Sequence, residues 1–538
     1  MLIGNKSKDI GRSLLDLARE SQSPRTILAA YVNGEIRELS YVLKSGDEIR
    51  WIDLSQADGV RIYQRSLVYL FYIALKECFA DIELHVLYSL SRGLYVEFST
   101  ELDHDDYKLI ENKMHELVSE AHPFVKNEIN HKEAREIYNK EGLHFKTELL
   151  RYKRNEKVTL YACKQRHHYF YGYMVPDTSY INMFEVIPYS PGAILLHPRT
   201  YSPDAIPPFF EQPKIHATHM ESEAWSDLMG VGEVCQLNRL IESGGVAQII
   251  QVNEALQEKK IAKIADAIID SKKRVVLIAG PSSSGKTTFT HRLKIQLMAE
   301  GVFSQTISLD NYFVDRDFTP LDEDGNYDFE SIEALKLDLL NENIEDLLEG
   351  KEVGLPLFDF REGKRQDNAY KMKLQKDQVI IFEGIHGLNE RLTPGVLKKD
   401  KFKIYISALT SLNLDQHNRI PTTDNRILRR MVRDHFTRGY GAEATLGMWD
   451  SVRRGEERHI FPFQEEADAV FNSALVYELA VIKKYALPLL EKIESNSPVY
   501  SQAKRLKKFL YYLKSIEDDR IVPSTSLLRE FIGGSSIL

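Results

Sequence analysis

The stretch with the clearest chemistry is a loop rich in glycine and serine, residues 280–287, with the sequence GPSSSGKT. It fits the spacing G-x-x-x-x-G-K-[ST], in which backbone N–H groups and the start of the next helix hold nucleotide phosphates. In such a loop Lys286 reaches the terminal phosphate oxygens and the Thr287 hydroxyl can ligate Mg²⁺. The residues expected to bind the nucleotide are Gly280, Ser282, Ser283, Ser284, Gly285, Lys286, Thr287 and Thr288.

The segments around this loop predict the elements that position it. RVVLIAG, before the loop, is a continuous apolar run typical of a buried parallel strand, and TTFTHRLKIQLMAE, after it, has helical spacing. Two more strand-like segments have an acid at or near their ends. FSQTISLD ends in Asp310, and QVIIFEG ends in Glu383-Gly384. Carboxyl ends of parallel strands meet at one sheet edge, so we expect Asp310 to accept a hydroxyl proton there and Glu383 to lie beside the metal.

An arginine-rich segment follows. Between residues 419 and 458 there are nine arginines and no lysine, and planar guanidinium groups suit phosphate oxygens. Arg426, Arg430 and Arg433 fall on one face of a predicted helix, while Ile427, Met431 and Val432 point toward a core. The pattern predicts a cationic lid over the phosphates. The alternative is an ion-paired surface helix, because Asp424 and Asp434 are close in sequence.

Seven pieces in order resemble the uridine kinase and phosphoribulokinase family: GPSSSGKTT, SLDNYF, YDFESIEA, LPLFDF, IIFEGI, DNRILRRMVRDHFTRG and FPFQEEADAVFN. The resemblance implies a doubly wound P-loop kinase that uses ATP and Mg²⁺ to phosphorylate the 5′-hydroxyl of a nucleoside, uridine or cytidine first. It implies these roles: catalysis by Asp310, Lys286, Arg433 and Arg438; metal binding by Thr287, Asp310 and Glu383; acceptor binding by Phe313, Asp328, Phe358, Phe360 and Arg430.

Three positions depart from the nucleoside kinases. Phe358 and Gly363 stand where those enzymes usually have Tyr and His near the pyrimidine edge, and Tyr440 replaces their second lid arginine. A phenyl ring stacks on a base but forms no hydrogen bond with its edge. A kinase of another sugar, polyol or sugar phosphate is therefore an alternative acceptor class. An RNA-binding regulator switched by nucleotide is a further alternative.

The first 200 residues carry a second resemblance. Strand-length runs with turns at Asn33-Gly34 and Gly46-Asp47, preceded by a helical pattern, resemble the TGS domain, a β-grasp unit. Residues 56–200 resemble the second domain of threonyl-tRNA synthetases. Arg65 and Tyr69 occupy the positions of that family's editing histidines, and residues 169–180 contain neither Cys nor His, so we expect no hydrolytic activity. This half could contact RNA or only pack against the kinase.

The whole chain is expected to be a multidomain α/β protein. The predicted parts are a TGS-like β-grasp domain (1–55), a synthetase-like α+β domain (56–200), a helical connector (201–271), a P-loop kinase domain (272–475) and C-terminal helices (476–538).

Composition narrows the setting. The net charge of −9 argues against bulk nucleic-acid binding, and three widely spaced cysteines suggest neither a disulfide framework nor a cysteine zinc site. The most apolar run, residues 66–75, is about half a membrane span. We expect a cytoplasmic homo-oligomer that does not enter membranes, with the histidine pairs 167–168 and 216/219 at its surface.

Overall fold

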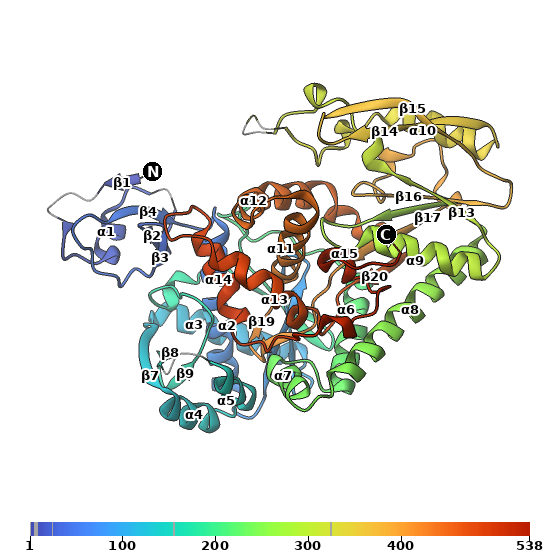
Figure 1. The fold of residues 1–538 in the computed structure, drawn as a ribbon. Coiled ribbons are helices and arrows are strands. Elements are labelled where there is room, and N and C mark those ends of the chain that lie inside the picture. Colours follow the sequence, from blue (N-terminus) through green and yellow to red (C-terminus); the bar gives the residue numbers. More distant parts are fainter. Residues whose placement is uncertain are drawn as a thin grey trace.

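The computed structural model describes residues 2–4, 9–23, 25–153, 157–322, 325 and 327–537. A five-stranded parallel sheet forms the centre of its C-terminal half, in the order β13-β16-β12-β17-β20 (Figure 1). The strands are β12 (Val275–Ala279), β13 (Ser304–Ser308), β16 (Val379–Gly384), β17 (Lys401–Ser407) and β20 (Ala469–Asn472). All of β12 is buried, as its apolar sequence predicts. The chain order reverses at β12, which is where open α/β sheets bind ligands.

Helices cover both faces of this sheet. α8 (Val246–Ser271) and α9 (Lys286–Ala299) pack on one face, through Ile261 and Phe289 among others. α10 (Leu337–Leu348) packs on the other face, where β14 (Glu352–Asp359) and β15 (Lys364–Lys373) form a separate hairpin. The sheet is therefore doubly wound, with helices on both of its faces.

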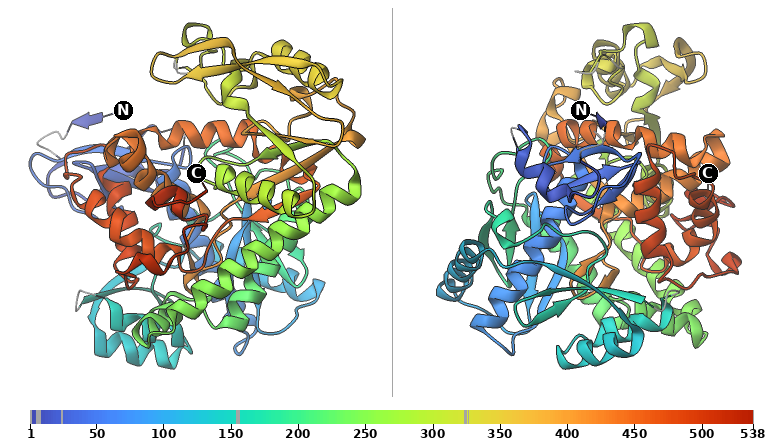
Figure 2. Two further views of the ribbon diagram at one scale, coloured as in Figure 1. Left: turned by 45° about the vertical axis from the view of Figure 1, so that its right-hand side comes forward. Right: turned by 90° about the vertical axis from the view of Figure 1, so that its left-hand side faces the viewer.

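The N-terminal half contains three smaller sheets (Figure 2). The first is β1-β4-β2-β3, with β1 (Leu2–Gly4), β2 (Ala29–Val32), β3 (Glu35–Arg37), β4 (Glu48–Ile52) and helix α1 (Leu14–Glu20). The second is β10-β11-β6-β5, with β5 (Leu84–Leu90), β6 (Gly93–Phe98), β10 (Glu185–Tyr189) and β11 (Gly192–Leu196). The third is β7-β8-β9, with β7 (Val125–Asn130), β8 (Lys157–Cys163) and β9 (Arg166–His168).

Four helices accompany these sheets. They are α2 (Ala57–Cys78), α3 (His104–Glu120), α4 (His131–Lys140) and α5 (His144–Leu149). α2 is almost entirely buried between the second and third sheets, because residues of β5, β6, β8 and β11 belong to one core with it. The apolar run that contains residues 66–75 is therefore a core helix. No helix within the described ranges is both long and apolar enough to cross a membrane.

Further helices connect the two halves and follow the central sheet. The segment between the two halves folds into α6 (Pro213–Met229), α7 (Val234–Glu242) and α8, so its predicted helical character is confirmed. After the sheet come α13 (Glu478–Glu491), α14 (Tyr500–Leu510) and the short α15 (Arg529–Ile532). They share a large core with α11 (Thr422–Arg433) and α12 (Ala442–His459).

A hairpin from the C-terminal half joins the two halves. It consists of β18 (Asn413–Asp415) and β19 (Asn418–Arg419). The Val86 amide donates to Gln416 O (2.8 Å), and Lys146 forms a buried ion pair with Asp415 (2.5 Å). These contacts tie the hairpin to the N-terminal sheets.

The surface position predicted for two histidines is wrong. His168 is fully buried, with its Nε2 2.6 Å from His417 Nδ1 on the hairpin. His219 is also buried, and its ring stacks on Tyr88 with centroids 3.8 Å apart. Burial lowers the pKa of His168 well below its usual range and that of His219 to about 3, so both are neutral core residues.

Candidate nucleotide and acceptor site

The phosphate loop has the backbone shape that its sequence predicts. Ser283 (φ +59°) and Gly285 (φ +85°) are left-handed, which turns successive N–H groups inward before α9 begins at Lys286. A Cβ on Gly280 would lie 2.1 Å from Ile406 O, so only glycine fits there. The buried hydroxyls of Ser283 and Ser284 have no hydrogen-bond partner within the described residues. The loop therefore offers unused donors to phosphate oxygens.

Lys286 lies against its own loop, donating to Gly280 O (2.9 Å) and Pro281 O (3.3 Å). Two acids share its environment. Asp310 sits in a short 3-10 turn just after β13, and Glu383 pairs in register with Ser308 of β13. Burial raises the pKa of Asp310, while Lys286 and Arg438 oppose that rise. Burial also raises the pKa of Glu383 to about 7, again against Lys286.

A third acid, Glu330, was not foreseen. Burial raises its pKa to about 7, with Glu456 adding to the rise and Arg430 and Lys286 opposing it. α12 can approach Glu330 this closely because residue 455 is a glycine: a Cβ at that position would lie 2.4 Å from Glu330 Cβ. The signal in the sequence was its position directly after Tyr327-Asp328-Phe329.

In the described part of the chain no three His, Cys, Asp or Glu side chains gather as a metal cluster. Mg²⁺ commonly binds one or two carboxylates together with substrate phosphates and water. The predicted set of Thr287, Asp310 and Glu383 fits that chemistry, because its two acids lie at one sheet edge beside the phosphate loop. These residues would hold the ion jointly with a nucleotide.

The arginines of α11 fall into two groups: some are buried and support the phosphate loop, and the others remain partly accessible. Arg426 is buried, ion-pairs with Glu456 and donates to Ser282 O (2.9 Å). Its position corrects the prediction that it shares one phosphate-facing side with Arg430 and Arg433: a buried carboxylate neutralises it, and it supports the loop backbone.

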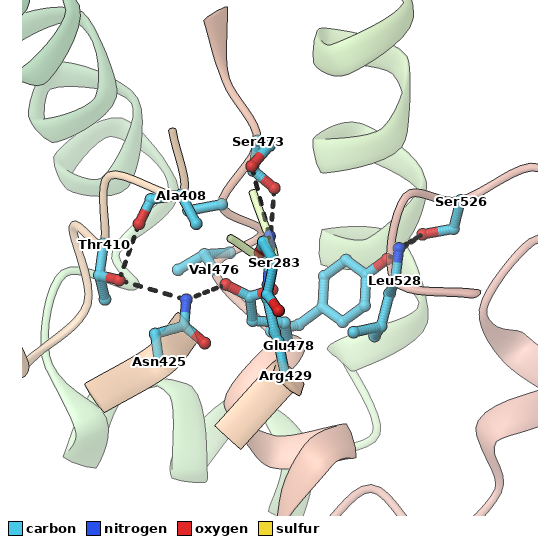
Figure 3. A network of polar contacts seen from close by, with 12 residues as sticks. Ser283, Ala408, Thr410, Asn425, Arg429, Ser473, Val476, Glu478, Ser526 and Leu528 are labelled. Carbon is cyan, nitrogen blue, oxygen red and sulfur yellow. Dashed lines mark hydrogen bonds and ion pairs between the residues drawn. The ribbon is translucent and has the colours of Figure 1, made fainter. Parts of the chain in front are cut away.

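Arg429 is the second supporting arginine (Figure 3). It ion-pairs with buried Glu478, donates to Ser473 O (2.8 Å) and reaches Ser283 O (3.4 Å). Glu478 also accepts from Asn425, whose amide donates to Thr410 Oγ1 (3.2 Å). This network holds α11 and the start of α13 beneath the phosphate loop.

The remaining lid arginines stay partly accessible. Arg430 donates to Ser282 Oγ (3.1 Å) and to Asp434 (3.3 Å), and Arg438 also pairs with Asp434 (3.3 Å). The ion-paired alternative therefore describes part of this segment. One buried acid, Asp434, pairs with all three cations that the sequence predicts for the acceptor and the transferring phosphate, Arg430, Arg433 (3.9 Å) and Arg438.

The C-terminal segment supplies a residue that no sequence pattern indicated. Glu530 on α15 accepts from Thr288 N (3.2 Å) and Thr288 Oγ1 (2.8 Å), and it lies 3.5 Å from Arg433 Nη1. Leu527 packs in the core beside α9 and next to Gly285. A carboxylate thus occupies N–H and O–H donors at the helix start, where nucleotide phosphates also bind.

Three of the predicted acceptor residues, Phe313, Phe358 and Phe360, form one aromatic cluster. Phe358 lies 5.6 Å from Phe313 and 5.1 Å from Phe360, measured between ring centroids, and Phe360 is 58% exposed. Asp328 accepts from Glu330 N (3.1 Å), and its other oxygen lies 3.9 Å from His459 Nε2. The structure therefore brings together an aromatic cluster, and it holds Asp328 next to the unforeseen acid Glu330.

Part of this chain matches a known protein family. Residues 275–480 match the phosphoribulokinase/uridine kinase family. A uridine kinase of Staphylococcus aureus (strain JH9) is 32% identical over 197 residues, covering 36% of this chain and 86% of that enzyme.

Two solved structures align with lower similarity. A possible uridine kinase from Bacillus stearothermophilus has 18% identity and a TM-score of 0.28, covering 40% of this chain and 98% of that one. D-glycerate 3-kinase from Cryptococcus neoformans has 14% identity and a TM-score of 0.20, covering 50% of this chain and 87% of that one. On the strength of the sequence match, this chain belongs to the phosphoribulokinase/uridine kinase family of P-loop kinases.

Proposed function

We propose that this protein transfers the γ-phosphoryl group of ATP to the 5′-hydroxyl of a nucleoside, with uridine and cytidine as the first candidates. The observation that carries the proposal is the position of Asp310. It lies at the carboxyl edge of the sheet, within the electrostatic influence of Lys286 and Arg438. A partly accessible acid there is suited to take a proton from an acceptor that stacks on the phenylalanine cluster.

The chain's own groups account for each part of the transfer. The acceptor oxygen bonds to the γ-phosphorus, the bond from that phosphorus to the β–γ bridging oxygen breaks, and ADP leaves with that oxygen. Asp310 takes the hydroxyl proton. Lys286 and Arg438 lower the pKa of Asp310 against its burial, which favours the ionised form that can accept the proton.

Cations complete the site. Arg433 and Arg438 remain partly accessible and can neutralise charge on the phosphoryl group, and Arg430 can contact the acceptor. Mg²⁺, when bound with ATP by Thr287, Asp310 and Glu383, would neutralise charge on the phosphate oxygens. The buried pairs of Arg426 and Arg429 keep the loop in place and are not free to bind phosphate.

A second candidate is a kinase of another sugar or sugar phosphate. Gly363 (φ +69°) lies where the nucleoside kinases have a base-reading side chain, and Arg316 fills that space: a Cβ on Gly363 would be 2.8 Å from Arg316 Cζ. Arg316 also donates to Phe360 O (2.8 Å). A cation at the edge of the aromatic cluster favours an acceptor that carries negative charge.

An acceptor screen for ADP release separates the two candidates. The panel contains uridine, cytidine, other nucleosides, free sugars and sugar phosphates, each tested with Asp310→Asn as the matched inactive control. The proposal expects ADP release with uridine or cytidine that the variant lacks. ADP release only with sugars or sugar phosphates would end the nucleoside assignment. If none of the acceptors in the panel gave ADP release, the proposal would lose its support altogether.

For the N-terminal half we propose the domain division given above, without catalysis. Tyr69, at one editing position, uses its hydroxyl to donate to Tyr161 O and Arg166 O (both 2.9 Å), so it serves structure. Arg65, at the other, donates to Tyr173 O (3.1 Å). Neither can act as a nucleophile or a base at neutral pH.

A further inference from the structure

A second cavity lies away from the phosphate loop, where the two halves meet. Its volume is about 140 Å³. Most of its lining comes from three segments far apart in sequence: α2, the stretch from the β18–β19 hairpin into α11, and α14. Val86 of β5, Leu94 of β6 and the pair Phe170 and Tyr171 complete it. An engineered cavity of about 150 Å³ is large enough for a benzene ring. The space is therefore suited to a small molecule with one ring or a short chain.

Most of the charged side chains that line this cavity are positive. Five cationic side chains line it, and Asp424 is the one carboxylate among its lining residues. The cations are Arg61, Arg65, Arg419, Arg505 and Lys508. Arg61 has a partner in Asp58 (2.7 Å), and Arg505 pairs with Asp424. Arg65, Arg419 and Lys508 form no ion pair with any described residue.

The protein around these three cations disfavours their charged forms, although Arg65 and Arg419 are only partly buried and Lys508 is exposed. Burial lowers the pKa of Arg65 and of Arg419 to about 10. Lys508 keeps accessible surface, yet the protein around it and the neighbouring cations lower its pKa to about 7. Buried cations are stable when an anion pairs with them. The arrangement lacks such an anion among the described side chains.

Arg65 is held in place by its surroundings. Its Cζ would lie 2.1 Å from a Cβ on Gly172, so the guanidinium lies close against the backbone at that glycine. The cavity lining also includes apolar side chains, among them Val68, Leu94 and Phe170. The cavity thus offers both cations and apolar surface.

We propose that this cavity is a binding site for a small phosphomonoester, whose phosphate contacts Arg65, Arg419 and Lys508 and whose organic group packs on the apolar lining residues. A phosphate dianion would supply an ion-pair partner to cations that form no ion pair with the described residues, and guanidinium groups match its oxygens. None of the lining residues belongs to the phosphate loop or to the predicted acceptor site. The site is therefore separate from the kinase centre.

The cavity adjoins the helix that supports the phosphate loop. Asp424, in the first turn of α11, pairs with Arg505 at the cavity, and Arg426 and Arg429 of the same helix contact Ser282 O and Ser283 O. A ligand in the cavity would thus bind at the first turn of α11, and the following turns of the same helix contact the phosphate loop.

The test is calorimetric titration of the full-length protein with phenyl phosphate, with inorganic phosphate and phenol as single-feature probes. The protein is kept saturated with ADP so that the phosphate loop is filled. We expect saturable binding of phenyl phosphate, weaker binding of inorganic phosphate and none of phenol. Arg419→Gln and Lys508→Gln should each weaken phenyl phosphate binding about tenfold or more, since each removes a charge-assisted contact.

Matched controls distinguish this site from the kinase site. Lys286→Gln, in the phosphate loop, should leave phenyl phosphate affinity unchanged. Loss of binding in Lys286→Gln but not in the cavity variants would overturn the proposal, and so would the absence of saturable binding to the unmodified protein. Far-ultraviolet circular dichroism checks folding, and Lys508→Gln alters a side chain that remains accessible. Binding of a tRNA transcript that Arg419→Gln weakens, without phenyl phosphate binding, would also overturn it.

Discussion

The phosphate loop and the cavity between the halves are both built to receive anions, but they do so by opposite means. The loop uses consecutive backbone N–H groups, and its supporting arginines, Arg426 and Arg429, are neutralised by buried Glu456 and Glu478. The cavity uses side-chain charges from distant segments, three of which have no carboxylate partner in the described chain. A site made of backbone donors can be recognised in a sequence, while a site made of assembled side chains becomes visible only after folding.

The largest expected effect concerns catalysis at the loop. Asp310→Asn removes the proton acceptor but keeps the size of the side chain. We expect turnover to fall by about 10²–10⁴-fold, in line with general-base contributions, with ATP affinity nearly unchanged. Steady-state ADP release and equilibrium nucleotide binding measure the two quantities. Full activity in this variant would show that another group, such as Glu330 or Glu383, takes the proton.

The next effect separates neutralised from uncompensated arginines. Glu478→Gln leaves Arg429 buried without a carboxylate, which should lower the free energy of unfolding by about 3–5 kcal/mol. In Arg419→Met the lost cation has no ion-pair partner among described residues, so stability should stay within about 1 kcal/mol or rise. Urea unfolding compares the two variants. Equal destabilisation by both would contradict the distinction.

A smaller effect depends on pH. The pKa of Glu330 is raised in the folded protein, so the folded state holds its proton up to about pH 7 while the unfolded state loses it near pH 4.5. The contribution of Glu330 to stability therefore falls as pH rises through this window.

Glu330→Gln removes that dependence. Because the side chain is partly accessible, we expect the variant to be more stable by about 1–2 kcal/mol at pH 8 and by little at pH 4.5. Thermal unfolding across this range measures the difference. A stability gain that does not change with pH would rule out titration of Glu330 as the cause.

The smallest predicted effect concerns the C-terminal segment. Glu530→Gln keeps hydrogen-bond acceptors for Thr288 but removes a negative charge from the start of α9. ADP should bind about three- to tenfold more tightly, since charges at a helix start contribute modestly. The control is Asp518→Asn, which alters an exposed acid paired with Arg520 (2.7 Å). Weaker ADP binding in Glu530→Gln would show that the carboxylate assists nucleotide binding.

The sequence predicted the features whose causes are local. The buried strand β12, the loop after it and helix α9 follow from apolar runs, glycine spacing and helical periodicity within residues 274–299. The membership of Ile427, Met431 and Val432 in a core is confirmed for the same reason. One of the two predicted acids, Glu383, lies at the end of a predicted strand, and Asp310 follows its strand by two residues.

What the sequence could not predict depends on partners far away along the chain. Arg426 was expected to face phosphate, and its burial could not be predicted because its partner Glu456 lies 30 residues later, on another helix. Glu530 contacts Thr288 across 242 residues, and no spacing rule connects them. His168 was expected at the surface, and it is buried because a hairpin from the other half covers it at His417.

The position of α15 has a practical consequence for dissecting this protein. The family match stops at residue 480, yet Leu527 fills the space next to Gly285, and the Phe531 ring lies 4.9 Å from the Arg429 guanidinium. A kinase fragment cut at that boundary would expose the underside of its own nucleotide loop to water. The smallest unit worth expressing alone must therefore extend at least to Ile532.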